Sequence, residues 1–336
     1  MNYLNNIFNN IINDFTKEEY SNQRILSRRF VLDNDIVFIV YYNNHNHTKE
    51  LAIKINKNFN ENIVAKYPNW DGIDMVVSEI DSGPDIGFYL AFKQLEGSDE
   101  MIYDAILEDI IVNIKLLQNY QHVINVIGKV LVKWKQFFNI HNELVLSDIQ
   151  QQGIYSELIF LEKLIEQYGE KALIFWSGCN FETHDFYING DAIEVKSTSS
   201  NSASSVTVSN EYQLDTNDVN GKLYLMFVIL RKSLSDGETI PLLIQRILDK
   251  LQSGTSIEIF EEKLFKSGYL LRNSEMYKIG FVIRDIKYFE VGVEFPCITK
   301  IKLPNGISDV SYKLNLSGCD RFYILEESLI RKLKEV

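Results

Sequence analysis

The chain has 336 residues, and its composition excludes several classes of protein. Apolar residues make up 46% of the sequence and charged residues 24%, which is typical of a globular protein and not of a disordered or collagen-like chain. The longest uninterrupted apolar run, Leu223–Leu230, is far shorter than the ~18 residues that cross a bilayer, and the net charge of −12 disfavours bulk adhesion to nucleic acid. The excess of acidic residues does not exclude a local basic surface.

Two further features of the composition concern the compartment. The N-terminal residues 1–6 lack the basic and small-residue features of a secretory signal, so we expect a cytoplasmic protein without a membrane anchor. Cys179, Cys297 and Cys319 are far apart, form no CxxC pair and are odd in number. This pattern argues against a disulfide framework and against a zinc knuckle.

Short apolar runs alternate with polar segments over residues 1–97, a pattern typical of β-strands. The runs are 36–42, 51–55 and 86–92. The connector 43–47 contains a His-Asn-His triplet, but its richness in asparagine favours a polar turn over a metal site. We therefore expect a strand-rich N-terminal domain.

The apolar spacing changes to that of a helix between Glu100 and Phe138. Two amphipathic helices with a break near Asn119 fit this spacing, which predicts a helical connector over residues 98–140.

The remaining residues, 141–336, are expected to form an α/β domain. Ser147-Asp-Ile-Gln150 has the form of a capping box, and the helix that it predicts ends at Gly169. A short strand over 172–176 and a mobile serine-rich loop over 197–205 are expected next. The tail predicts a buried strand from Leu223, helices near 240–251 and 257–265, strands near 278–283 and 288–293, and a helical finish.

A hairpin is the most informative part of this domain. Asn189-Gly190 between two alternating runs indicates a two-residue turn of type I′. With Ile188 opposite Asp191, the register places Asp185 opposite Glu194. Strand alternation then predicts two faces. The polar face carries Asp185, Tyr187, Ala192, Glu194 and Lys196, and the core face carries Phe186, Ile188, Ile193 and Val195.

The two opposed carboxylates require an explanation. Unit charges about 5 Å apart repel by about 3 kcal/mol at an effective dielectric of about 20. A hard divalent cation would convert this repulsion into a binding site, and Lys196 would lie beside the bound phosphate. The alternative is a surface hairpin whose acids are solvated, with Lys196 neutralising Glu194.

The wider pattern resembles the PD-(D/E)XK nuclease superfamily, and more closely the PD-(D/E)XK motif family that is found near restriction and phage-defence genes. The segments that carry the resemblance are Gly153–Leu161, Trp176–Gly178, Asp185-Phe186, Glu194–Thr198 and Gln213-Leu214. The resemblance implies a restriction-endonuclease-like core, a mixed sheet flanked by helices, within an α/β (α+β) fold. Two departures are His184 in place of the proline that often precedes the first acid, and the sequence Gly-Ile-Tyr-Ser before Glu157.

The resemblance also implies roles for individual residues. Asp185 and Glu194 match the metal-binding acids, Lys196 matches the catalytic lysine, and Glu157 matches a helix glutamate that shares in the metal site and in catalysis. The substrate-binding positions would be Gln213, Ser197 and Thr198. Two alternatives stay open: Glu157 is an exposed helix residue, and Gln213 is a solvent-facing residue of a capped helix start. We expect His184 to be a structural histidine, or one that supports a metal-binding residue without touching the metal, and not a ligand.

We therefore expect a Mg²⁺-dependent DNA endonuclease of a restriction or phage-defence system, with Mn²⁺ able to substitute. The alternatives are an inactive nuclease-fold subunit that holds DNA or assembles a defence complex, and an α/β protein whose hairpin acids are accidental. The sequence has no GxxxxGK[ST] phosphate loop, so an ATP-driven step would need another protein. The expected partners are DNA, a second copy of the chain, and other proteins such as a methyltransferase or an ATPase.

Overall fold

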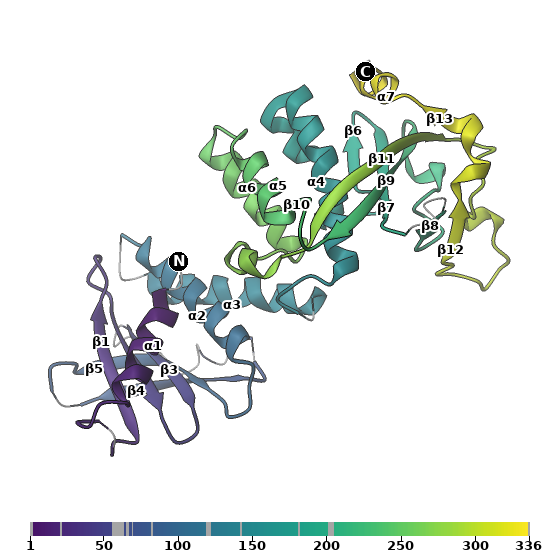
Figure 1. The fold of residues 1–336 in the computed structure, drawn as a ribbon. Helices are drawn as coiled ribbons and strands as arrows, with labels where there is room; N and C mark the ends of the chain where they lie inside the picture. The colour runs from purple at the N-terminus through teal and green to yellow at the C-terminus, as the bar shows by residue number, and fades with distance from the viewer. Residues whose placement is uncertain are drawn as a thin grey trace. The chain divides into compact units, whose positions relative to one another are not determined.

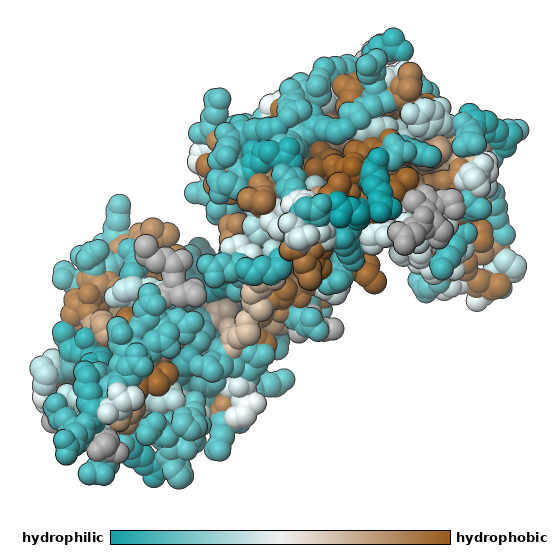
Figure 2. Space-filling model, in the orientation of Figure 1, coloured by the Kyte–Doolittle hydropathy of each residue, from teal (hydrophilic) through white to brown (hydrophobic). Residues whose placement is uncertain are grey.

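The computed structural model describes residues 3–20, 22–55, 64, 67–68, 70–81, 83–118, 122–141, 143–180, 182–200 and 205–334. The fold is α/β, and the chain divides into two compact units, Met1–Asn142 and Glu143–Val336 (Figure 1). Hydrophilic residues cover most of the visible face of each unit (Figure 2). Across the described ranges, no helix combines the length and the apolar character needed to span a membrane.

The first unit is built on a five-stranded antiparallel sheet in the order β1-β2-β3-β5-β4. The strands are β1 (Ile25–Val31), β2 (Val37–Asn43), β3 (Thr48–Ile55), β4 (Ile73–Ile80) and β5 (Gly87–Gln94). The three predicted apolar runs are confirmed as β2, β3 and β5. Residues 44–47 form a turn, in which Nδ1 of His47 lies 3.1 Å from the hydroxyl of Tyr42.

Three helices belong to the same unit: α1 (Tyr3–Asp14), α2 (Glu100–Lys115) and α3 (Val123–Ile140). The two predicted amphipathic helices are confirmed as α2 and α3, and Asn119 lies outside the described residues. Glu108 of α2 accepts hydrogen bonds from the backbone N–H groups of Tyr3 and Leu4, at 2.6 and 2.7 Å. A carboxylate at the first turn of α1 satisfies free N–H groups and complements the helix dipole.

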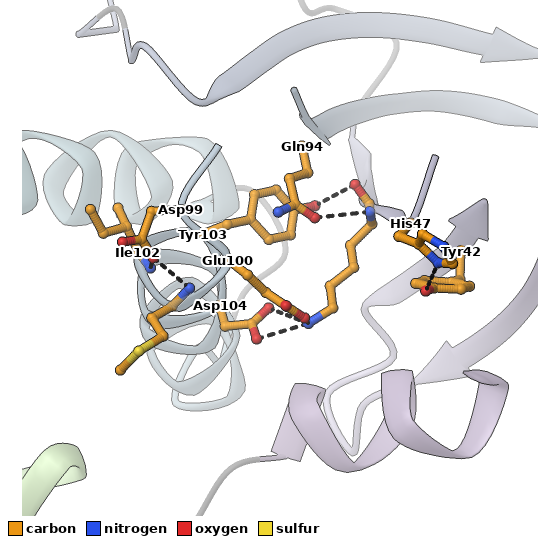
Figure 3. A network of polar contacts seen from close by, with 10 residues as sticks. Tyr42, His47, Gln94, Asp99, Glu100, Ile102, Tyr103 and Asp104 are labelled. Atoms are coloured by element: carbon orange, nitrogen blue, oxygen red, sulfur yellow. Dashed lines mark hydrogen bonds and ion pairs between the residues drawn. The ribbon is translucent and has the colours of Figure 1, made fainter. Parts of the chain in front are cut away.

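A buried lysine joins the sheet to α2. The side chain of Lys49 on β3 is 3% exposed, and its ammonium lies 2.8 Å from a carboxylate oxygen of Asp104 and 2.6 Å from one of Glu100. Figure 3 shows the two carboxylates side by side at the start of α2. The hydroxyl of Tyr103 donates to the backbone carbonyls of Lys49 and Phe92. These contacts satisfy a charge that would be costly to bury alone.

The second unit begins with α4 (Asp148–Tyr168). Its capping box is formed as predicted, because the Ser147 hydroxyl accepts from the N–H of Gln150 and the Gln150 side chain accepts from the N–H of Ser147. Gly169 ends the helix with φ 68°, a conformation that favours glycine.

A mixed sheet forms the centre of this unit, in the order β10-β11-β9-β7-β6, with β13 also paired to β11. Its strands are β6 (Phe186–Ile188), β7 (Asp191–Thr198), β9 (Leu223–Ser233), β10 (Glu238–Thr239), β11 (Gly280–Val291) and β13 (Tyr323–Ile324). The pair β7 and β9 is parallel and the other pairs are antiparallel. Strands β8 (Ser205–Val208) and β12 (Tyr312–Asn315) form a separate two-stranded sheet.

Both faces of the mixed sheet are covered. One face packs with α4, α5 (Ile240–Leu248), α6 (Gly254–Lys266) and α7 (Glu326–Lys334) in a large apolar cluster. The other face packs in a smaller cluster with β8, β12 and the segments beside them. The sheet flanked by helices that the family resemblance implied is therefore present.

Two predicted elements of the second unit differ from the structure. Residues 172–176 were expected as a strand, but Gly169–Phe175 is a 3₁₀ helix, η3, which buries Ala172 and Leu173 and leaves Ile174 exposed. A short apolar run does not distinguish a strand from a helical turn. The two strands expected over 278–293 are one strand, β11, with a change of register between Ile283 and Asp285. The predicted strand from Leu223 and the predicted helices of the tail are confirmed as β9, α5, α6 and α7.

Candidate active site

The predicted hairpin is formed by β6 and β7. Asn189 and Gly190 have φ values of 52° and 93°, as a type I′ turn requires. The register pairs Ile188 with Asp191, Tyr187 with Ala192 and Phe186 with Ile193, as the sequence arithmetic predicts.

The register does not extend to Asp185, and the expected ladder pair between Asp185 and Glu194 is absent. The backbone carbonyl of Asp185 accepts hydrogen bonds from the N–H groups of Ser177 and Gly178, at 2.8 and 3.0 Å. Its Oδ2 accepts from the N–H of Val195 at 2.7 Å. Because these contacts replace the strand pairing, β6 begins one residue later and the alternation of faces stops at Phe186.

The division into one core face and one polar face is also only partly correct. Phe186, Ile188, Ile193 and Val195 belong to the larger apolar cluster, as expected. Tyr187 and Ala192 of the opposite face pack into the smaller cluster, because β8 and its neighbours cover that side. The polar part of this face is therefore limited to the end of β7 that carries Glu194 and Lys196.

Glu194 is a buried carboxylate with one paired and one unpaired oxygen. Its side chain is 2% exposed, and its Oε1 lies 2.8 Å from Nζ of Lys196, whose side chain is 16% exposed. Among the residues that the structure describes, Oε2 has no hydrogen-bond partner. Nδ1 of His184 lies 3.5 Å from that oxygen.

Glu157 reaches the same place from α4. Its Oε2 accepts a hydrogen bond from the indole N–H of Trp176 at 2.8 Å. Between Gln151 and Glu162 every residue of the helix is buried except Gly153 and Glu157, which lie one turn apart. Glu157 itself is only partly exposed, so the alternative interpretation of this residue as an exposed helix residue is wrong.

Gly178 shows how near Glu157 and Asp185 are to each other. A Cβ atom on this glycine would lie 2.8 Å from Oδ1 of Asp185 and 3.0 Å from Oε2 of Glu157. The two carboxylate oxygens are thus within about 6 Å of each other. A side chain at position 178 would push them apart, so the glycine permits the close approach.

The charges in this cluster change the pKa of its members. Burial and the charges of Glu194 and Glu157 raise the pKa of Asp185 well above its usual range. Burial, together with the charge of Glu194, raises the pKa of Glu157 to about 7, although the hydrogen bond from the Trp176 indole lowers this pKa. Burial would lower the pKa of Lys196, but the three acids outweigh burial and raise it. Glu157, Asp185, Glu194 and Lys196 therefore form one electrostatic group.

The chemistry of this group fits a hard divalent cation. Its acidic members supply oxygen ligands, repel one another, and leave Oε2 of Glu194 without a partner among the described residues. Within the described part of the chain, no three His, Cys, Asp or Glu side chains form a ready ligand shell. This finding is compatible with a cation held by one or two carboxylates, with water and phosphate oxygens completing the shell, as Mg²⁺ prefers.

The three expected substrate-binding residues, Ser197, Thr198 and Gln213, make different contacts in the structure. The hydroxyl of Ser197 lies 3.2 Å from Nε2 of Gln152, which the sequence did not indicate as part of the site. The Thr198 hydroxyl accepts from the N–H of Ser200 at 3.2 Å. Gln213 accepts from the N–H of Ser209 at 2.8 Å within a turn, so its side chain stabilises its own loop and not a helix start.

This arrangement defines a class of protein: a mixed sheet flanked by helices, with an Asp, a Glu-x-Lys strand and a helix glutamate gathered at one end of a hairpin. The chain belongs to the family described as "Putative PD-(D/E)XK family member (DUF4420)", whose model matches residues 5–317. It is therefore a member of a nuclease-like family, and PD-(D/E)XK nucleases generally use divalent metal ions. Comparison with curated proteins and with solved structures found no match.

Proposed function

We propose that this protein is a Mg²⁺-dependent DNA endonuclease that hydrolyses phosphodiester bonds in a restriction or phage-defence system, with Mn²⁺ able to substitute. The observation that carries the proposal is the gathering of Glu157, Asp185, Glu194 and Lys196 into one electrostatic group. Membership of the PD-(D/E)XK family supports it.

Asp185 and Glu194 would hold the cation, with help from Glu157. When bound, the cation would supply Lewis-acid polarisation of the scissile phosphate and would offset the repulsion among the three acids. The N–H of Val195 orients the carboxylate of Asp185, and the indole of Trp176 orients that of Glu157. Both carboxylates are thus fixed before a ligand arrives.

Lys196 acts as a cation and not as a base. Its raised pKa keeps the ammonium protonated at neutral pH, so it has no free electron pair with which to remove a proton from water. Its charge stabilises the negative charge that develops on the phosphate during hydrolysis. Removing one such group typically costs about 10²–10³-fold in rate.

The partly open surface of α4 favours a substrate with an accessible backbone. Apart from the neighbouring backbone of α4, a Cβ on Gly153 would meet no atom of the described residues within 4 Å, and this glycine lies one turn before Glu157. A phosphodiester backbone can therefore approach the group without displacing a side chain at this position. Ser197, Thr198 and Gln213 stay predicted as contacts to the substrate.

The experiment combines calorimetry with Mn²⁺ and cleavage of a supercoiled plasmid in Mg²⁺. Asp185→Asn should lose metal binding, and Lys196→Met should retain it while cleavage falls by about 10²-fold or more. Asp285→Asn and Lys287→Met are matched controls, since they make the same changes of residue type at an exposed aspartate and a partly exposed lysine of β11 that lie 3.9 Å apart. Cleavage that persists in both site variants would refute the proposal.

The net charge of −12 favours a second candidate, a nuclease-fold subunit that holds DNA or assembles with other proteins of a defence complex. A methyltransferase or an ATPase would be a suitable partner, and cutting of both DNA strands would need a second copy of the chain. Metal binding without cleavage, together with a larger complex in native mass measurement of a lysate, would favour this candidate. A free monomer or dimer would count against it.

A further inference from the structure

His184 is a fully buried side chain with two unsatisfied ring nitrogens among the described residues. It is 0% exposed. Among the described residues, neither of its ring nitrogens has a hydrogen-bond partner. A buried polar group without a partner costs about 1–3 kcal/mol, so an imidazole is a poor choice for a position that needs only packing.

The carboxylate of Glu194 has an oxygen that lacks a hydrogen-bond donor among the described residues. Oε1 is paired with Lys196, whereas Oε2 is buried and without a partner in the described chain. The unpaired oxygen and Nδ1 of His184 face each other at 3.5 Å. A neutral imidazole with its proton on Nδ1 is a donor at that atom, and a small side-chain rotation would complete the hydrogen bond.

The surroundings of His184 keep its ring beside Glu194. The ring packs edge to face against Tyr187, with ring centroids 5.7 Å apart and an interplanar angle of 64°. The next residue, Asp185, is held by the two backbone hydrogen bonds from Ser177 and Gly178. The anchored backbone at Asp185 and the contact with the Tyr187 ring therefore restrict the movement of the imidazole.

We infer that His184 is a positioning residue that donates its Nδ1 proton to Oε2 of Glu194 and fixes the orientation of this carboxylate. A carboxylate has four lone-pair sites, so Glu194 can accept from Lys196 and His184 and still bind a cation. Hydrogen bonds to a metal-binding carboxylate from outside the metal shell orient it. The inference rests on the proposed function, since orientation of Glu194 matters to activity only if Glu194 binds metal.

Two substitutions separate positioning from packing. His184→Asn keeps a donor near the place of Nδ1, whereas His184→Phe keeps an aromatic ring against Tyr187 but has no donor. Calorimetric titration with Mn²⁺ in the absence of DNA should show about 10–100-fold weaker binding for the Phe variant and substantial recovery for the Asn variant. Unchanged affinity in the Phe variant, or equal loss in both folded variants, would overturn the inference.

A measurement on the unchanged sequence covers the case in which a variant does not fold. The chain has 5 histidines, so the nitrogen spectrum of their side chains is simple enough to assign. His184 should carry its proton on Nδ1, and Glu194→Gln should shift that signal. A proton on Nε2 would overturn the inference. If the wild type binds no Mn²⁺, the proposed function fails, but this spectrum still tests the contact between His184 and Glu194.

Discussion

Replacing Glu157 by glutamine should stabilise the metal-free protein at alkaline pH. The pKa of Glu157 is about 7, compared with an ordinary value of 4.5 for a glutamate, and burial is the main cause. Because the folded state holds this proton more tightly than the unfolded chain, the free energy of unfolding falls as the pH rises from about 4.5 to about 7. Glutamine resembles the protonated acid and does not incur this loss.

The size of the effect follows from the same two values. One pKa unit corresponds to about 1.4 kcal/mol, so the change from 4.5 to about 7 corresponds to about 3 kcal/mol at pH 8. The gain should be near zero at pH 4 and should increase through the window between the two pKa values. The side-chain carbonyl of glutamine can still accept the indole N–H of Trp176, so this contact does not obscure the comparison.

Urea unfolding in the presence of EDTA, followed by circular dichroism and tryptophan fluorescence, measures this difference at each pH. Glu261→Gln is the control, because this residue of α6 is exposed and its replacement should give no gain that grows with pH. Added Mn²⁺ should stabilise the wild type more than the Glu157 variant. A variant less stable than the wild type at pH 8, or a difference that is the same at pH 4 and pH 8, would refute the reasoning.

Three further outcomes are expected. Gly178→Ala would place a methyl group 2.8 Å from Oδ1 of Asp185 and 3.0 Å from Oε2 of Glu157, so calorimetry should show Mn²⁺ binding about tenfold weaker. Equal affinity would contradict a metal site shared by these two carboxylates. Gly190→Ala forces an alanine to adopt φ 93° in the hairpin turn and should lower the free energy of unfolding by about 1–2 kcal/mol in a urea titration. Asp104→Asn leaves the 3% exposed Lys49 with Glu100 as its remaining charged partner and should destabilise the protein by about 1–3 kcal/mol. A thermal midpoint equal to that of the wild type would count against a stabilising ion pair.

The sequence predicted those elements whose signals are local. The turn at Asn189-Gly190 specified its own register, and the capping box at Ser147 together with Gly169 defined both ends of α4. Residues 172–176 were mispredicted because an apolar run of that length fits either a strand or a helical turn.

The candidate site was predictable only in part. The predicted hairpin register brought Asp185, Glu194 and Lys196 to one face, and the family resemblance added Glu157. Strand alternation, continued back from Phe186, puts His184 on the core face and Glu194 on the polar face, whereas their side chains lie 3.5 Å apart. The break in the ladder depends on hydrogen bonds from Ser177 and Gly178, which are tertiary contacts that no periodicity encodes.

The parallel pairing of β7 with β9 has a consequence for synthesis on the ribosome. All four members of the candidate site precede β9 in the sequence, yet Glu194 pairs with Leu225 of that strand. The other neighbour of β9 is β11, which ends at Val291. A nascent chain therefore exposes these acids well before the strands that bury them have been translated. At about 5–20 residues per second, synthesis from Lys196 to the end of β9 takes about 2–7 s and synthesis to the end of β11 about 5–20 s, during which the sheet beside the hairpin is incomplete. The cluster of charges can assemble only late, after most of the second unit has been made.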